Sequence, residues 1–156
     1  MNPAQQISRG DLTSCSSVSF EQLHAKVKDR RAIVGVVGLG YVGLPFAVQV
    51  ARSGFDTVGL DISREKTIAV NQGESYIGDV SNSDLQQAIQ DHGLFASDHF
   101  GALADCDIIV VAVPTPLTKN LTPDLRAIEA ATREIANYLR PGQLITLEST
   151  TFPGTT

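Results

Sequence analysis

Short apolar stretches alternate with amphipathic stretches along this chain from residue 32 onward. The apolar stretches are rich in valine and isoleucine, which is typical of buried strands. The stretches between them repeat apolar residues every three or four positions, which is typical of helices. This alternation predicts an α/β fold with a doubly wound parallel sheet and right-handed crossovers. The predicted strands are Ala32–Val37, Phe55–Leu60, Leu94–Ala96, Asp107–Val113 and Gln143–Leu147; the predicted helices are Val42–Ser53, Ser63–Asn71, Asn82–His92 and Asp124–Leu139, with a helical turn at Gly101–Ala104.

The first predicted strand runs directly into a glycine-rich turn, and an apolar helical pattern follows. Strand, glycine turn and helix start come in the order that binds the pyrophosphate of a dinucleotide. Gly38 allows the tight turn, Gly40 lets the backbone approach the phosphates, and Gly43 lets the helix pack closely on the strand. The helix N-terminus offers unpaired N–H groups to the anion. The alternative is that these glycines serve turn geometry only. The candidate phosphate-binding residues are Gly38, Leu39, Gly40, Tyr41, Val42 and Gly43.

An acidic residue ends the second predicted strand at the expected distance from the turn. Asp61 lies 18 residues after Gly43 (61 − 43), close to the roughly 20 residues that separate the turn from the carboxylate that binds the ribose hydroxyls. Its charge would repel a 2′-phosphate, which favours NAD over NADP as the cofactor. Arg64 and Lys66 weaken that argument, because either cation can meet a phosphate.

Two further groups of candidate residues follow the fourth and fifth predicted strands. In such a sheet, ligands bind beyond the carboxyl ends of the strands, near the point where the strand order reverses. Thr115, after Val113 and Pro114, is placed to bond a ribose or phosphate, or else it only shapes a proline-rich loop. Glu148, Ser149 and Thr150 are placed to orient a substrate, a water or the nicotinamide, or else they cap a following helix.

The five strands are expected in the order 3-2-1-4-5, with the apolar fourth strand near the centre. A complete dinucleotide-binding sheet has a sixth strand. Because the chain reaches Thr156 just after the fifth, we expect residues 32–156 to form a domain truncated before the sixth strand, without a substrate domain.

Residues 1–31 precede the alternating pattern and are expected to form a separate segment. Its first part is polar and rich in serine, which is typical of a tail without a core of its own. Phe20, Leu23 and Val27 then follow at helical spacing and predict a short amphipathic helix, with Ser19 as its N-cap.

Composition narrows the possible partners. The net charge of −5 argues against binding to nucleic acid or to an anionic membrane surface. No apolar run approaches the roughly 18 residues of a membrane span. The N-terminus lacks a basic region followed by an apolar core, so no secretory signal is expected. Cys15 and Cys106 lie far apart in unlike contexts, so we expect reduced thiols and a cytoplasmic protein. No metal site is expected, and Cys106, between Asp105 and Asp107, is interpreted as a buried residue rather than a nucleophile.

Taken together, the motifs resemble the UDP-glucose/GDP-mannose dehydrogenase family over Ala32 to Thr156, and thus a Rossmann-type NAD-binding domain. The final motif is most similar to the branch of UDP-N-acetylglucosamine and UDP-N-acetylmannosamine 6-dehydrogenases. The motifs are G-L-G-Y-V-G-L-P, L-D-I with Lys66 close behind, V-P-T-P-L, P-D-L and L-E-S-T-T-F-P-G-T-T.

The resemblance implies a reaction and a set of roles. Such enzymes oxidise the C6 alcohol of a nucleotide sugar to the acid with two NAD and one water, through intermediates on a cysteine. It implies that the glycine turn binds the pyrophosphate and that Asp61 and Lys66 contact the adenosine ribose. Thr115 then contacts the cofactor, and Thr150 lies near the nicotinamide and positions the catalytic water.

The family's nucleophilic cysteine and most of its substrate contacts lie in parts that this chain does not contain. The chain alone is therefore expected to bind NAD but not to turn over. The longer enzyme of which this chain would be one domain, called the parent below, is expected to be a homo-oligomer. The family dimerises largely through a helix outside this chain. The competing hypotheses are a stand-alone NAD-sensing module and a UDP-glucose 6-dehydrogenase.

Overall fold

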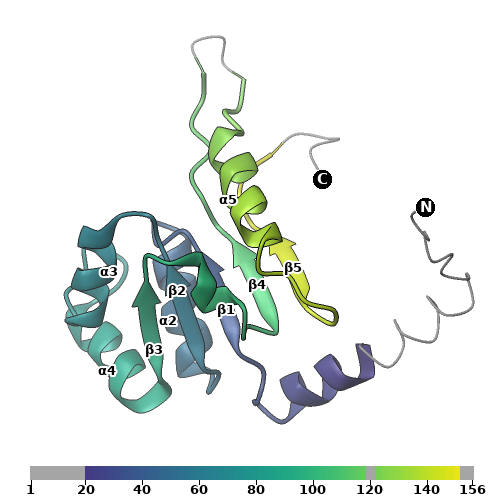
Figure 1. Ribbon diagram of the computed structural model, residues 1–156. Helices are drawn as coiled ribbons and strands as arrows, with labels where there is room; N and C mark the ends of the chain where they lie inside the picture. Colours follow the sequence, from purple (N-terminus) through teal and green to yellow (C-terminus); the bar gives the residue numbers. More distant parts are fainter. Residues whose placement is uncertain (1–19, 119–121, 152–156) are drawn as a thin grey trace, which may run out of the picture.

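The computed structural model describes residues 20–118 and 122–151 and contains one parallel sheet with helices packed against it (Figure 1). The strands are β1 (Val34–Val37), β2 (Thr57–Leu60), β3 (Leu94–Ser97), β4 (Ile108–Val111) and β5 (Leu144–Leu147). The helices are α2 (Gly43–Arg52), α3 (Arg64–Asn71), α4 (Asn82–His92), the short 3₁₀ helix η1 (Phe100–Leu103) and α5 (Arg126–Ala136). A further helix covers residues 20–28. Within these residues no helix is both long and apolar enough to cross a membrane.

The strand order is β3-β2-β1-β4-β5, and every neighbouring pair is parallel. This confirms the predicted α/β class, the doubly wound arrangement and the order 3-2-1-4-5. The order reverses between β1 and β4, where Val34 pairs with Ile108 and Val37 with Val111. In an open sheet of this kind the chain diverges above and below the carboxyl ends of these two strands, which leaves a crevice for a ligand.

Two apolar layers hold the sheet between the helices. On one face, Val34, Val36 and Val110 pack with residues of α2, α3 and α4. On the other face, Val37, Ile109 and Val111 pack with η1 and α5. Strands that are apolar on both faces are expected when helices cover both sides of a parallel sheet.

Several element boundaries differ from the predicted ones. The helix predicted over Asp124–Leu139 is shorter, because Asp124 lies outside it and its carboxylate accepts the N–H of Arg126 at 3.1 Å. At the other end the helix stops at Ala136, before the predicted end at Leu139, and the Leu139 side chain is 46% exposed. Four of the predicted strands extend one or two residues beyond the observed ones at an end, whereas the strand predicted at Leu94–Ala96 stops one residue before the end of β3.

The helix over residues 20–28 confirms the predicted helix, but its apolar stripe is not buried. Phe20 is 69% exposed and Val27 36% exposed, whereas Leu23 is half-buried. A polar contact ties the helix to the sheet, because the Lys26 ammonium donates to Asp107 Oδ1 at 2.7 Å. The predicted N-cap, Ser19, lies outside the described residues.

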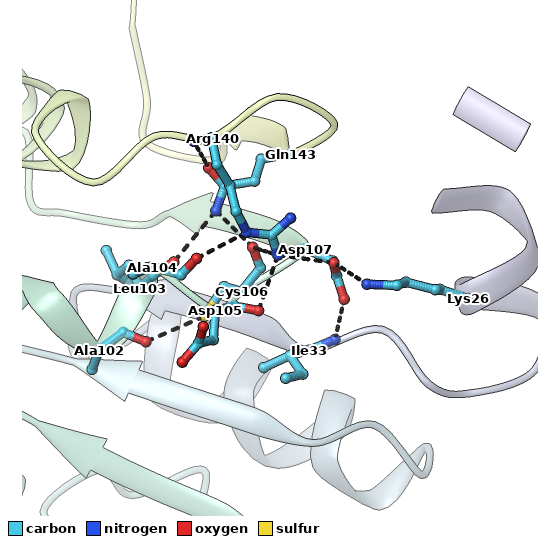
Figure 2. A network of polar contacts seen from close by, with 10 residues as sticks. All are labelled: Lys26, Ile33, Ala102, Leu103, Ala104, Asp105, Cys106, Asp107, Arg140 and Gln143. Carbon is cyan, nitrogen blue, oxygen red and sulfur yellow. Dashed lines mark hydrogen bonds and ion pairs between the residues drawn. The ribbon is translucent and has the colours of Figure 1, made fainter. Parts of the chain in front are cut away.

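Asp107 joins three segments at the amino end of β4 (Figure 2). Its buried carboxylate accepts from Lys26, from the guanidinium of Arg140 at 3.0 Å and from the backbone N–H of Ile33 at 3.1 Å. Arg140 also donates to the carbonyls of Ala104, Asp105 and Cys106. Burial alone would raise the pKa of Asp107, but the three hydrogen bonds outweigh it and lower the pKa below its ordinary value.

Asp107→Asn should therefore destabilise the domain near neutral pH by about 2–3 kcal/mol, because a charged acceptor with three donors is lost. A lowered folded-state pKa contributes stability above the ordinary pKa of 3.8, and that contribution is lost as the pH falls through the lower folded value. The difference in the free energy of unfolding between wild type and Asp107→Asn should consequently become smaller in acid. Urea denaturation of both proteins at several pH values measures this difference.

The matched control is Asp105→Asn, since Asp105 lies in the same turn but is exposed. It should change the free energy of unfolding by less than about 0.5 kcal/mol. A destabilisation by Asp107→Asn that stays constant from neutral pH down to pH 3 would contradict the ion-pair account.

Candidate dinucleotide site

The glycine turn is built where the strand order reverses. The N–H of Gly38 donates to Leu60 O at 2.7 Å, and its φ of +98° lies in the region that favours glycine. A Cβ on Gly38 would lie 2.7 Å from the carbonyl oxygen of Ala112, and a Cβ on Gly43 would collide with the carbonyl oxygen of Gly38. Gly38 and Gly43 are therefore required so that β1, β4 and α2 can approach each other.

Gly40 differs from both, because a Cβ there would meet no atom within 4 Å. It faces a cavity of about 480 Å³, which Tyr41 and Val42 also line. Val42 caps α2 without a side-chain hydrogen bond. Within the described residues, the backbone N–H groups of residues 40–43 donate to no protein acceptor. Unpaired N–H groups at a helix N-terminus, beside a glycine that leaves room for a ligand, fit the pyrophosphate of a dinucleotide.

Asp61 lies directly after β2 and is only 7% exposed. Its Oδ2 accepts the N–H of Leu39 at 2.9 Å and the ammonium of Lys66 at 3.0 Å, and its Oδ1 accepts the N–H of Ser63 at 2.9 Å. The carboxylate thus supports the glycine turn itself, a role that the sequence did not reveal. The Leu39 N–H is taken up by this bond, and the Leu39 side chain is fully buried in the core. Leu39 therefore supports the turn from inside the protein.

Two cavities meet at the glycine turn. The first, of about 400 Å³, extends between the end of β2 and α5. The second, of about 480 Å³, extends across the turn toward the end of β5. Both fall within the range of roughly 300–1,000 Å³ typical of small-molecule sites. The residues that line both are Gly38, Asp61, Lys66, Val113 and Pro114.

The residues predicted after the fourth and fifth strands gather in the second cavity. Thr115, Glu148, Ser149 and Thr150 all line it, together with the glycine turn. The hydroxyl of Ser149 donates to the carbonyl of Val113 at 2.8 Å, so Ser149 also ties the end of β5 to the loop after β4. Parallel neighbours bring these segments to one edge, although more than 30 residues separate them in the chain.

Comparison with known proteins shows the family of this domain. Residues 32–156 match the model of the UDP-glucose/GDP-mannose dehydrogenase family, NAD binding domain. The chain belongs to the UDP-glucose/GDP-mannose dehydrogenase family. NAD is therefore the cofactor of this domain.

Curated relatives of the UDP-glucose/GDP-mannose dehydrogenase family include several enzymes for N-acetylated sugars. The chain is 39% identical over 123 residues to an NDP-N-acetyl-D-galactosaminuronic acid dehydrogenase from Ralstonia nicotianae, covering 79% of this chain and 29% of the relative. It is 35% identical over 123 residues to a UDP-N-acetyl-D-glucosamine 6-dehydrogenase from Pseudomonas aeruginosa, covering 79% and 28%. The chain thus spans less than a third of the length of these relatives.

Solved structures of the family have the same fold. A UDP-N-acetylmannosamine dehydrogenase from Pyrococcus horikoshii superposes with a TM-score of 0.74 at 36% identity, covering 80% of this chain and 30% of that one. A GDP-mannose dehydrogenase from Pseudomonas aeruginosa, solved as a ternary complex, superposes with a TM-score of 0.73 at 35% identity, covering 78% and 29%.

Within this family domain, some cavity residues were not predicted from the sequence. The first cavity takes a wall from η1 and α5, and the second takes a wall from the loop between α3 and α4. A small-residue face on the predicted α5 was the only available signal. The unpredicted lining residues are Val37, Leu60, Ile62, Ser63, Tyr76, Ile77, Phe100, Ala112, Ala127, Ala130, Ala131 and Glu134.

Cys106 lies away from both cavities, at the amino end of β4. It is fully buried, as predicted, and its thiol donates to the carbonyl of Ala102. Burial, and then the carboxylates of Asp105 and Asp107, raise the pKa of Cys106 to about 11, although Arg140 lowers it. A thiol that stays protonated at neutral pH is a poor nucleophile. These properties are those of a structural cysteine.

Proposed function

We propose that this chain supplies the NAD-binding domain of a nucleotide-sugar 6-dehydrogenase for surface polysaccharide biosynthesis. The parent enzyme would oxidise the C6 alcohol of UDP-N-acetylglucosamine or UDP-N-acetylmannosamine to the uronic acid with two NAD. The observation that carries the proposal is the pair of cavities joined at the glycine turn, with unpaired backbone N–H groups where they meet. NAD supplies a nicotinamide ring that accepts a hydride.

The two cavities support a division of the cofactor between them. In this proposal the first cavity takes the adenosine half, with Asp61 and Lys66 at its ribose, because α5 and η1 offer an apolar wall for a base. The N–H groups of Gly40, Tyr41 and Val42 hold the pyrophosphate. The nicotinamide half then lies in the second cavity, next to Thr115 and Thr150.

In this proposal the substrate binds at the same edge of the sheet, beside the carboxyl ends of β4 and β5. We propose that Thr150 positions the catalytic water and the nicotinamide, and that Glu148 and Ser149 face the sugar. The preference for an N-acetylated sugar is supported by the motif at Leu147–Thr156 and by the names of the relatives, which act on N-acetylated sugars. Phe152 and the residues after it lie outside the described part of the chain.

The remaining parts of the proposal concern the parent protein. We infer that its nucleophilic cysteine lies outside this chain, because Cys106 is buried away from the cavities. The chain by itself would then bind NAD without turning over a UDP-sugar. A homo-oligomeric parent and a cytoplasmic location, with Cys106 kept as a free thiol, belong to the same proposal.

Calorimetric titration of the chain with NAD and NADP tests the cofactor half. We expect saturable binding of NAD, and binding of NADP weaker by about tenfold or more, because the Asp61 carboxylate repels a 2′-phosphate. Absence of NAD binding by the folded chain, or equal binding of the two cofactors, would contradict the proposed site.

An assay of the same sample with UDP-N-acetylglucosamine, UDP-N-acetylmannosamine and UDP-glucose tests the other half. The expected result is no NADH formation by the chain alone. NADH formation with a UDP-sugar would contradict the inference that the nucleophile lies elsewhere. A longer parent that forms NADH only with UDP-glucose would favour UDP-glucose 6-dehydrogenase, and a parent inactive on all three would favour an NAD-sensing module.

A further inference from the structure

The loop between α3 and α4 is held at both ends and carries an aromatic residue into the second cavity. The N–H of Ser75 donates to Asn82 Oδ1 at 2.8 Å, and the Ser75 hydroxyl donates to the carbonyl of Ile77 and accepts the N–H of the same residue. Glu74 donates to the carbonyl of Ala69 at the end of α3. Tyr76, between these fixed points, is 37% exposed and lines the cavity. The sequence predicts no helix or strand between Asn71 and Asn82.

The Tyr76 side chain contacts the glycine turn directly. Its hydroxyl donates to the carbonyl oxygen of Leu39 at 2.8 Å. On the opposite side of the same residue, the Leu39 N–H donates to Asp61. Lys66, which pairs with Asp61, lies 6.0 Å from the centre of the Tyr76 ring. Tyr76, Asp61 and the buried Leu39 side chain therefore hold one residue of the turn from three directions.

The Leu39 carbonyl belongs to the same peptide group as the N–H of Gly40. A trans peptide is planar, and its N–H points away from its C=O, so a bond that fixes the carbonyl also fixes the direction of the N–H. A hydrogen bond to the carbonyl additionally polarises the group and makes the N–H a better donor. The Gly40 N–H donates to no acceptor among the described residues and lies at the cavity.

We propose that Tyr76 is a positioning residue for NAD, which orients the Leu39–Gly40 peptide so that the Gly40 N–H donates to the pyrophosphate. This inference rests on the proposed function of the site. Tyr76 acts through the backbone of the turn, so removal of its hydroxyl should weaken the binding of the pyrophosphate. The adenosine half, in the first cavity, does not contact it.

The hydroxyl of Tyr76 remains a hydrogen-bond donor near neutral pH. Burial, and then the negative charge of Asp61, raise its pKa above the ordinary value of 10.0. Ionisation would place a second negative charge beside Asp61 and would turn a donor into an acceptor facing a carbonyl. The bond to Leu39 is therefore independent of pH near neutrality.

Tyr76→Phe tests the proposal, because it removes the hydroxyl and keeps the ring beside Lys66. We expect the Kd for NAD and for ADP-ribose to rise about two- to tenfold, the equivalent of one lost hydrogen bond. The Kd for adenosine should stay within twofold. The matched control is Tyr138→Phe, since Tyr138 is similarly exposed at 39% but lies just beyond α5, away from both cavities.

A second readout needs no cofactor. In the NMR spectrum of the free protein, Tyr76→Phe should shift the Gly40 amide resonance, because the carbonyl of its own peptide loses a hydrogen bond. Tyr138→Phe should leave that resonance in place. An unshifted Gly40 resonance would overturn the proposed clamp even in a chain that binds no NAD.

The remaining outcomes separate the two proposals. A Tyr76→Phe chain with a lower Tm but unchanged Kd for NAD would overturn the positioning role and leave a purely structural contact. A wild-type chain that is folded but does not bind NAD would contradict the proposed function. A wild type that binds NAD, with a Tyr76→Phe variant of equal affinity, would overturn only the role of Tyr76.

Discussion

Gly40→Val should abolish NAD binding while the domain stays folded. The new side chain would meet no protein atom within 4 Å at its Cβ, and Gly40 is not among the glycines with positive φ, so the backbone accepts a valine. The same open space is where the phosphates approach the backbone in the proposed site. We expect the Kd for NAD to rise by at least about 100-fold, equivalent to about 2.7 kcal/mol.

Calorimetry with NAD, together with thermal unfolding of the same samples, measures this effect. Gly78→Val is the matched control, because Gly78 also has open space at its Cβ and no positive φ, but lines neither cavity. It should retain the wild-type affinity. A Gly40→Val chain that unfolds cooperatively at the wild-type Tm and still binds NAD would show that the turn is structural only.

Asp61→Ala should weaken NAD binding by about 10- to 100-fold, since hydrogen bonds to a charged group contribute about 1.5–3 kcal/mol. Two losses combine in this variant. The ribose hydroxyls lose a charged acceptor, and the buried N–H of Leu39 loses its partner, so the turn itself loosens. Because the second loss also lowers stability, Asp61→Asn is the companion variant that keeps the shape of the side chain.

Titration of both Asp61 variants with NAD and NADP distinguishes the effect of the lost negative charge from the effect of the lost hydrogen bond to the turn. Without the negative charge at residue 61, the preference for NAD over NADP should shrink, because the repulsion of the 2′-phosphate disappears. Asp79→Asn, on an exposed loop position, is the control and should leave both affinities unchanged. A preference for NAD that survives both substitutions would place the source of discrimination elsewhere.

The sequence predicted the apolar central strands well and the ends of the helices less well. Val34 to Val37 and Ile108 to Val111 are continuous apolar runs, and only a sheet covered on both faces buries such runs, so their central position could be predicted. The helix ends were less predictable. Asp124 and Leu139 fit a helical pattern, but α5 begins after Asp124, whose carboxylate accepts the N–H of Arg126, and it ends at Ala136, before Leu139.

The candidate site likewise contains residues that the sequence could predict, while the role of Asp107, outside the site, could not be predicted. The glycines and Asp61 could be predicted because their spacing encodes a local strand–turn–helix geometry and the strand that follows it. Asp107 could not be assigned its role as a partner of Lys26 and Arg140, since these residues are 81 and 33 positions away in the chain. Which side chain meets which across such separations depends on packing of the whole domain.

The sequence by itself determined the fold class and the glycine turn between β1 and α2, because short-range periodicity and glycine spacing specify these features locally. The strand order then followed from the order that is usual for a doubly wound sheet. Only the tertiary structure decided that Asp61 and Tyr76 hold the two peptide groups of Leu39 from opposite sides. It alone also joined the ends of β4 and β5 to the glycine turn around one cavity. The physical reason is that hydrogen bonds and cavity walls form between segments distant in the chain, and parallel pairing brings those segments to the same edge of the sheet.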